Sequence, residues 1–516
     1  MFPLIRAISF LVFLHLASIT TAQAVKLDTS ASGAILSLTL KDAVAQALEN
    51  NISISIEKFN SKIKAEGITE SESEFDLTFG ADLSTDEKNK QLSSTASSSR
   101  NTSETENLDF DLSLTQKLAT GADYELNFTN SRDETNSTSA TLNPTYSSEL
   151  ELSLTQPILK DYGVDLNKRN IYIAKNNVAI SDFEFKNKVI DIISDVENSY
   201  WDLVFSINDL EVKKKSLKRA RDLARSVQAQ VAVGMMAPIE TLQAESEVAS
   251  REELLLAAQD LIKDNEDNLK NILNISFEST EGIKSIVPAE HPEVIADEIT
   301  IDKAISKALS QRPDYLAKKR ELENQDILVK YRENQIYPSV DLVGSLGLNG
   351  LSGEGTGKYQ GDYGDSLSDT LSGDYYNWEV GIKLSYPLGN RSAKSQLTAS
   401  RLEKARLLLS IKNLEKEIIA ETRQAIRQIK TDAKRLQASE VAKKLAEEKL
   451  KAEEKKFKVG LSTSFNILEF QEDLAEKQRN ELKAIIGFNK SKIRLRQALA
   501  TTLENHNIKL QEEEDF

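Results

Sequence analysis

The chain has 516 residues, no cysteine and a formal net charge of −16 at pH 7. Without cysteine it has no disulfide, no thiolate metal site and no thiol nucleophile. The negative charge argues against a general nucleic-acid-binding protein, whose surface must neutralise phosphates. Charged residues make up 28% of the chain and aromatic residues only 6%, a balance that suits long helices better than several globular cores.

Residues 1–24 have the pattern of a secretory signal peptide. Arg6 precedes a mostly apolar run over residues 7–19, and the segment 22–24 (AQA) matches a cleavage site. About thirteen apolar residues are too few to span a bilayer, so we expect cleavage and export rather than an N-terminal anchor. Later apolar runs are also shorter than a membrane-spanning helix, so we expect any part within a membrane to consist of strands.

After the signal, the sequence predicts a helix, several strands, a very long helix and a shorter helix, and then the same order again. In the long helices apolar residues recur in steps of three, four and seven, as in coiled coils. Six segments alternate apolar and polar residues with a period of two, which predicts strands with one apolar and one polar face. The predicted long helices are 167–232 and 392–458, the shorter helices are 41–73, 239–273, 302–335 and 465–500, and the strands are 75–83, 108–114, 124–128, 150–154, 340–346 and 378–384.

The order of these elements reflects a tandem duplication. Residues 38–48 align without a gap with residues 299–309, and residues 152–158 (LSLTQPI) correspond to 382–388 (IKLSYPL). The pair Val233-Gly234 is matched by Val459-Gly460 in the same order. We therefore predict two structural repeats, 25–274 and 299–503, joined by a linker over 275–298 and followed by an acidic tail over 504–516.

The predicted fold is α+β and mainly α: a protomer of long coiled-coil-like helices with a few antiparallel strands. Six strands are too few to close a wide barrel, and an open sheet edge is not tolerated in lipid, so several copies would share one barrel. The alternative is a periplasmic or surface coiled-coil structural protein without a pore. The period-two segments, separated by polar loops over 93–103, 130–146 and 349–377, favour the barrel.

With these elements in place, the chain resembles the TolC family of outer-membrane efflux proteins over nearly all of the predicted mature sequence. The resemblance rests on the duplicated order and on five short motifs. These motifs are 154–157 (LTQP), 196–203 (VENSYWDL), 312–314 (RPD), 337–339 (YPS) and the two Val-Gly pairs.

The resemblance implies a homotrimer whose outer-membrane β-barrel continues as a periplasmic α-barrel. It further implies a passive exit duct of an efflux or type I secretion system, docked on a periplasmic adaptor (a membrane fusion protein) and an inner-membrane transporter. Such a protein is in contact with outer-membrane lipid, binds no nucleic acid, performs no covalent chemistry and needs no cofactor.

One feature departs from the family pattern. The first repeat has four candidate strands where the family has two, and residues 116–121 (QKLATG) form a turn between two of them. Either the barrel is wider than usual or the additional hairpin lies outside it.

Other motifs that could suggest chemistry are weak. Of three histidines, His15 lies in the signal, and His291 and His506 lack the spacing of a metal pair, so we predict no metal site. The glycine-rich run 347–358 departs from a phosphate-binding loop at Ser352 and Tyr359, and we expect a flexible outside loop.

The candidate functional residues lie where each long helix ends. Gly234 and Gly460 can adopt the left-handed conformation that closes a helix, and Ser462, Thr463 or Ser464 can cap the next one. We therefore expect two tight helical hairpins, with Pro238 in the first turn of the restarted helix of the first repeat.

The resemblance makes these hairpins the adaptor-docking tip of the duct. The residues it assigns to the tip are Gly234, Met235, Gly460, Leu461, Ser462 and Thr463. It places a pore constriction just beyond, at Asn466 and Glu469, where only Glu469 carries a charge. A ring of carboxylates there would favour cations.

Overall fold

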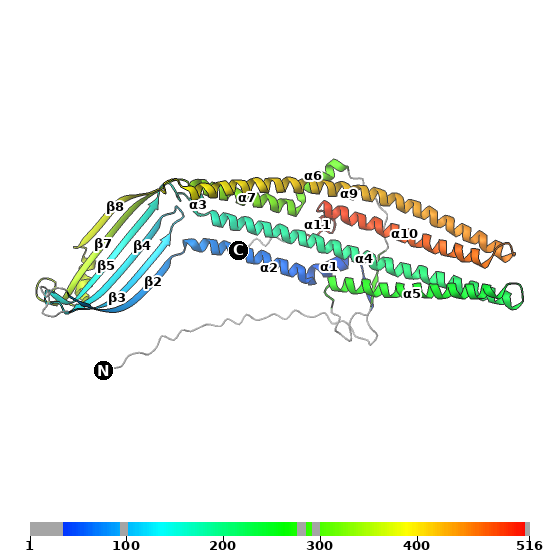
Figure 1. The fold of residues 1–516 in the computed structure, drawn as a ribbon, viewed down its shortest axis with the longest axis horizontal. Helices are drawn as coiled ribbons and strands as arrows, with labels where there is room; N and C mark the ends of the chain where they lie inside the picture. The colour runs from blue at the N-terminus through cyan, green and yellow to red at the C-terminus, as the bar shows by residue number, and fades with distance from the viewer. Residues whose placement is uncertain (1–34, 93–101, 276–284, 291–299, 511–516) are drawn as a thin grey trace, which may run out of the picture.

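The computed structural model describes residues 35–92, 102–275, 285–290 and 300–510. This part of the chain is elongated, with a sheet at one end, two helical hairpins at the other and short helices near the middle (Figure 1). The predicted signal peptide and residues 511–516 of the predicted tail lie outside the described residues.

Within the described residues, six strands form one antiparallel sheet in the order β2-β3-β4-β5-β7-β8. All six predicted strands are therefore confirmed, and the mainly helical α+β class is confirmed with them. The strands are β2 (Thr78–Gln91), β3 (Thr102–Lys117), β4 (Asp123–Thr135), β5 (Leu142–Pro157), β7 (Ser339–Gly355) and β8 (Tyr376–Ser385).

Several strands are longer than predicted, and two predicted loops are correspondingly shorter. β4 and β5 extend into the segment 130–146, and β7 includes most of the glycine-rich run that we expected in a flexible loop. These strand ends were missed because polar residues, proline and glycine interrupt the apolar row there, so the period-two signal fades. The remaining part of the second loop contains an unpredicted helix, α8 (Tyr363–Ser372), with a capping box between Asp362 and Asp365.

The helices form a layer that continues from the sheet (Figure 1). The long helix α4 (Arg169–Ala232) packs along α2 (Ile52–Glu72) and then along α5 (Pro238–Ile272). Between α4 and the second long helix, α9 (Arg391–Lys458), lie α7 (Pro313–Asn334) and α10 (Ser464–Ala498), end to end. The long helix α4 thus has a pair of shorter helices on each side, and α9 lies beside the pair α7 and α10. The remaining helical segments are α1 (Leu40–Asn50), η1 (Ser73–Phe75), α3 (Val164–Asn167), α6 (Ile301–Gln311) and α11 (Thr502–Asn505).

The predicted helices 41–73 and 302–335 are each interrupted by one residue. Asn51 separates α1 from α2 and accepts hydrogen bonds from the backbone N–H groups of Ser53 and Ile54. Arg312 holds the equivalent position between α6 and α7, just before Pro313, and pairs with Asp314. The duplication therefore extends to these breaks, which apolar periodicity does not reveal.

The main core lies near the middle of the molecule. Tyr200 is fully buried, donates a hydrogen bond to the Leu38 carbonyl oxygen (3.1 Å) and accepts one from the Glu290 backbone N–H (3.2 Å). Glu197, from the same motif, is also buried and pairs with Arg496 at 2.9 Å. The VENSYWDL motif therefore organises this core.

Two segments outside the predicted helices contribute to this core. β1 (Ile35–Leu38) pairs in parallel with β6 (Ser285–Pro288), which lies inside the segment predicted as a linker. The start of the predicted tail is also ordered, because Ile508 and Leu510 pack against the core cluster.

Candidate functional site

Each hairpin begins at a glycine in the left-handed conformation. Gly234 has φ +74° and Gly460 has φ +78°. In the first hairpin the Met235 N–H donates to the Gln230 carbonyl (2.8 Å), and in the second the Leu461 N–H donates to the Lys456 carbonyl (2.9 Å). Together with the bonds from the two glycine N–H groups to Val231 and Phe457 (both 3.0 Å), these form Schellman motifs that satisfy the last carbonyls of α4 and α9.

The restart of α10 is capped by Thr463, one of the three predicted candidates. Its hydroxyl accepts a hydrogen bond from the Asn466 N–H at 3.3 Å. Ser462 instead donates to the Glu453 carboxylate (2.6 Å), and Lys456 pairs with the same carboxylate (2.9 Å). Both contacts lower the pKa of Glu453 below its ordinary value, the Ser462 hydrogen bond more than the Lys456 pairing. This contact ties the turn back to the end of α9.

The first hairpin restarts differently. Pro238 occupies the first turn of α5, as predicted, and Ala237 at the cap position has no side-chain acceptor. In the first hairpin a proline therefore starts the second helix, whereas in the second hairpin a hydroxyl cap starts it.

Both tips expose large apolar side chains. Met235 and Leu461, at equivalent positions, are 77% and 78% exposed. Contiguous exposed apolar residues at the end of a rod are typical of an interaction surface. The exposed apolar residues of the two tips are Val233, Met235, Ile239, Leu242, Val459, Leu461 and Phe465.

The two hairpins are joined to one another. Leu223 and Val227 of α4 form a small apolar cluster with Ile467 and Leu468 of α10. Ser464, at the start of α10, is hydrogen-bonded to Glu240, at the start of α5. The tips therefore form a single surface within one protomer.

A buried arginine adds a polar connection behind the tips. Arg251 of α5 is only 4% exposed. Its guanidinium donates to the Ser216 carbonyl of α4 (3.2 Å) and to the Gln471 side chain of α10 (3.3 Å), and it pairs with Glu247 at 2.6 Å. One side chain thus holds three helices together, and sequence reasoning missed it because its partners are distant in the chain.

The residues predicted for a constriction lie on the first turns of α10. Asn466 is partly buried and its side chain lies 3.5 Å from the Ser462 hydroxyl, whereas Glu469 is exposed. The Asn466 side chain therefore folds back towards the hairpin turn, whereas the Glu469 carboxylate faces solvent.

The sheet at the opposite end has one apolar and one polar face. One row on the apolar face crosses all six strands through residues that pair directly: Phe79, Leu114, Leu126, Leu152, Leu346 and Trp378. Three residues further along, a row on the other face consists of Asp82, Asp111, Thr129, Glu149 and Asn349. One sheet can therefore contact lipid on one side and water on the other.

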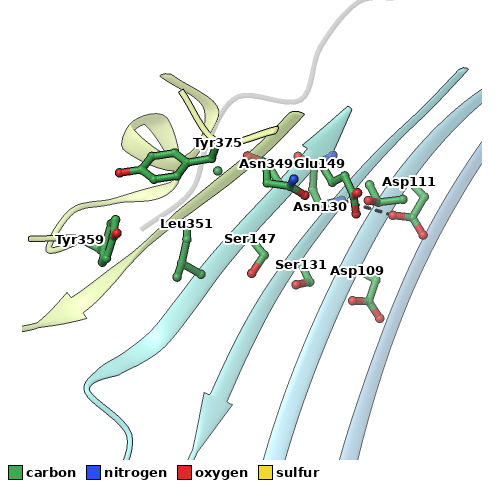
Figure 2. Close-up of a pocket in the computed structure, with 13 residues that line it drawn as sticks. Asp109, Asp111, Asn130, Ser131, Ser147, Glu149, Asn349, Leu351, Tyr359 and Tyr375 are labelled. Carbon is green, nitrogen blue, oxygen red and sulfur yellow. Dashed lines mark hydrogen bonds between the residues drawn. The ribbon is translucent and has the colours of Figure 1, made fainter. Parts of the chain in front are cut away.

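The polar face is hollowed near the outer ends of the strands. Figure 2 shows Asp109, Asp111 and Glu149 with hydroxyl and amide side chains on this face, and Tyr359 and Tyr375 at its border. The hollow encloses about 610 Å³ and is open to solvent. No helix among the described residues is both long and apolar enough to cross a membrane.

Comparisons with known proteins agree with this arrangement. The family model described as "Outer membrane efflux protein" matches residues 43–274 and 304–501. Nodulation protein T of Rhizobium leguminosarum bv. trifolii is 24% identical over 346 residues, which are 65% of this chain and 68% of that protein.

Similar folds occur among solved outer-membrane proteins. The CmeC outer membrane channel of Campylobacter jejuni has a TM-score of 0.65 at 14% identity, covering 91% of this chain and 90% of that one. VceC of Vibrio cholerae has a TM-score of 0.63 at 17% identity, covering 89% and 95%. The MtrE outer membrane channel of Neisseria gonorrhoeae has a TM-score of 0.61 at 14% identity, covering 93% and 95%. Because the family model covers most of the sequence, the chain belongs to the outer membrane efflux protein family, whose members are channels and not enzymes.

Proposed function

We propose that three copies of this chain form a passive exit duct, with the sheets in the outer membrane and the helices extending into the periplasm. The observation that carries the proposal is the sheet with an apolar row across all its strands on one face and a polar row on the other face. Such a sheet separates lipid from an aqueous lumen.

The edges of the sheet support assembly with further copies. Within the described residues β2 pairs only with β3, and β8 only with β7, so each has a free edge. Unpaired backbone groups are not tolerated in lipid, and pairing β2 of one copy with β8 of the next satisfies both edges. Three copies close the ring, as the family resemblance implies.

The helical layer has apolar edges as well. On α2 an exposed stripe recurs at helical spacing, and α9 at the opposite edge exposes several leucines and one valine, which suits packing between copies. The exposed stripe of α2 consists of Ile52, Ile56, Phe59 and Ile63, and that of α9 includes Leu402, Leu409, Val441 and Leu445.

The hairpin tips are the proposed docking surface for a periplasmic adaptor. The tip residues are Gly234, Met235, Gly460, Leu461, Ser462 and Thr463. Their support is the exposed apolar surface at each tip and the rigid Schellman turns that present it. The adaptor would connect the duct to an inner-membrane transporter, for efflux or for type I secretion, and a cleaved signal peptide over residues 1–24 would direct export.

Just beyond the tips, Glu469 with Asn466 is the proposed constriction. Three Glu469 carboxylates in a confined pore would attract cations and repel anions. The exposure of Glu469 supports this role. Glu454 is an exposed carboxylate of the same hairpin. Glu454→Gln is therefore the control for Glu469→Gln, because it removes one surface charge from the same hairpin.

The assembly is tested by substituting the α2 stripe. Phe59→Glu should place three charges in apolar contacts and abolish heat-modifiable trimers in the outer membrane fraction. Lys64→Glu, at an exposed position on another side of α2, is the control and should leave trimers intact. Trimers that survive Phe59→Glu, or a wild-type protein recovered as a soluble monomer, would contradict the proposal.

A further inference from the structure

The additional hairpin of the first repeat, β3 and β4, is an interior part of the sheet. β3 pairs with β2 over fourteen residue pairs, from Thr78↔Thr115 to Gln91↔Thr102, and β4 pairs with β5 on its other side. Within the described residues, β2 is connected to the rest of the sheet only through this hairpin. The sheet therefore continues through it.

The turn of this hairpin is anchored where the sheet meets the helices. Lys117 pairs with Glu74 of η1 at 2.6 Å, and the Gln116 amide donates to the Phe75 carbonyl at 2.7 Å. On the other side, the Gly163 N–H donates to the Thr120 carbonyl at 3.1 Å. A Cβ at Gly121, whose φ is +93°, would collide with the backbone of Asp161. The turn thus fits between the end of α2 and the start of α3.

The side chains of the hairpin match the two faces of the whole sheet. Leu114 and Leu126 lie in the apolar row, whereas Asp111 and Thr129 lie in the polar row. A hairpin lying in water would gain nothing from a continuous apolar row. Its pattern is that of a lipid-facing strand pair.

The width of the sheet can be compared with that of the helical layer. Six strands, spaced by about 4.8 Å and tilted by about 35–45°, span an arc of about 35–41 Å. At the junction the layer has four helices, α2, α4, α7 and α9, which at about 8–10 Å each span about 32–40 Å. Four strands would span only about 23–27 Å. The six-stranded sheet therefore matches the helices in width.

We propose that the barrel of the trimer has eighteen strands, six from each protomer, and is as wide as the helical duct below it. The distance across the barrel between backbones is about 34–39 Å. Barrels of sixteen to eighteen strands leave an open aqueous channel. The exit would thus pass bulky hydrated cargo, including polypeptide segments, without narrowing at the outer membrane. This inference rests on the trimeric duct proposed above.

Single cysteines test the position of the hairpin, because the chain has none of its own. Thr129→Cys lies on the polar face and Phe128→Cys, its neighbour, on the apolar face. Trimers in outer-membrane vesicles are treated from outside with maleimides coupled to polyethylene glycols of increasing size. Ser139→Cys, in the exposed loop after β4, is the control and should react with every size.

With the hairpin in the barrel, Thr129→Cys reacts with small polymers and stops reacting once the polymer exceeds the lumen. Phe128→Cys reacts only with a lipid-soluble maleimide. If the hairpin lies outside the barrel, both cysteines react with every polymer, and that result would overturn the inference.

A deletion tests the width. Removing residues 102–135 brings β2 beside β5 with the faces preserved, since Phe79, Leu114, Leu126 and Leu152 share one row. In this variant Glu149→Cys, on the polar face of β5, should have a limiting polymer diameter lower by about one third than in the full chain. An unchanged limit refutes the wider exit. If the full chain forms no trimer at all, the proposed duct itself fails, which is a separate result.

Discussion

The docking role of the tips can be tested at Gly460. Its φ is +78°, and a Cβ added there would meet nothing within 4 Å. Gly460→Trp therefore adds bulk to an exposed position without disturbing the packing of the protomer. We expect export to be lost while trimers still accumulate in the outer membrane.

The cost of this change to the protomer is small. An L-residue in the left-handed conformation costs about 1–2 kcal/mol, which is a local strain at the end of α9. The effect on docking is larger because a trimer carries three such tips. A loss of only about 1 kcal/mol per tip, summed over three tips, lowers adaptor affinity on the order of a hundred-fold.

The chain offers a matched control for the strain. Gly373 ends α8 with φ +72°, and a Cβ there also meets nothing within 4 Å. Gly373→Trp has the same backbone cost, but α8 packs against β5 and β7, and the sheet lies at the opposite end of the molecule from the tips (Figure 1). The assay compares export of the cargo and adaptor cross-linking for both variants at equal trimer levels.

Two outcomes would exclude a docking role for Gly460. If Gly460→Trp exports normally, the second tip does not contact the adaptor closely. If Gly373→Trp impairs export equally, the effect comes from backbone strain rather than from lost docking. Gly460→Asn further separates lost docking from backbone strain, because asparagine tolerates the left-handed conformation but still adds a side chain at the tip.

Three other predictions follow from the tips. In denaturant titrations, Arg251→Met should lower the free energy of unfolding by about 2–4 kcal/mol, because its buried partners lose a charged donor. The control is Arg221→Met, which should lower it by only about 0–1 kcal/mol because the ion pair of Arg221 is exposed. Because the folded-state pKa of Glu453 is lowered, its stabilisation of the tip is present above the ordinary value of 4.5 and is lost as pH falls through the lowered pKa. Ser462→Ala should reduce this acid sensitivity in hydrogen-exchange measurements at the tip, and an unchanged profile would exclude the contact. Glu469→Gln should weaken block by divalent cations in planar-bilayer conductance, and equal block in wild type and variant would count against the constriction.

The helices could be predicted to within a few residues because their ends carry explicit signals. Val-Gly pairs end both long helices, and Pro238 or Thr463 starts the next one. The breaks at Asn51 and Arg312 also had local signals, an amide cap and a following proline, but the apolar periodicity on both sides concealed them. Local chemistry, not periodicity, decides where a helix stops.

Features that depend on contacts distant in sequence could not be predicted. The guanidinium of Arg251 joins α4, α5 and α10, and nothing in its local sequence distinguishes it from an exposed helical arginine. The end of β7 escapes prediction because residues 347–355 are rich in glycine and place leucines on both faces, so no period-two apolar pattern marks it as a strand. The position of the β3–β4 hairpin remained open because only strand pairing shows that the sheet passes through it.

Whether this chain forms a trimeric duct in the outer membrane can be tested on the purified protein. Full-length protein extracted from the outer membrane fraction is sized by native mass and then added to a planar bilayer. We expect a heat-dissociable trimer that forms ion-conducting channels. A monomeric or fibrous protein that is recovered without membrane and does not conduct would show that the chain is not an outer-membrane duct.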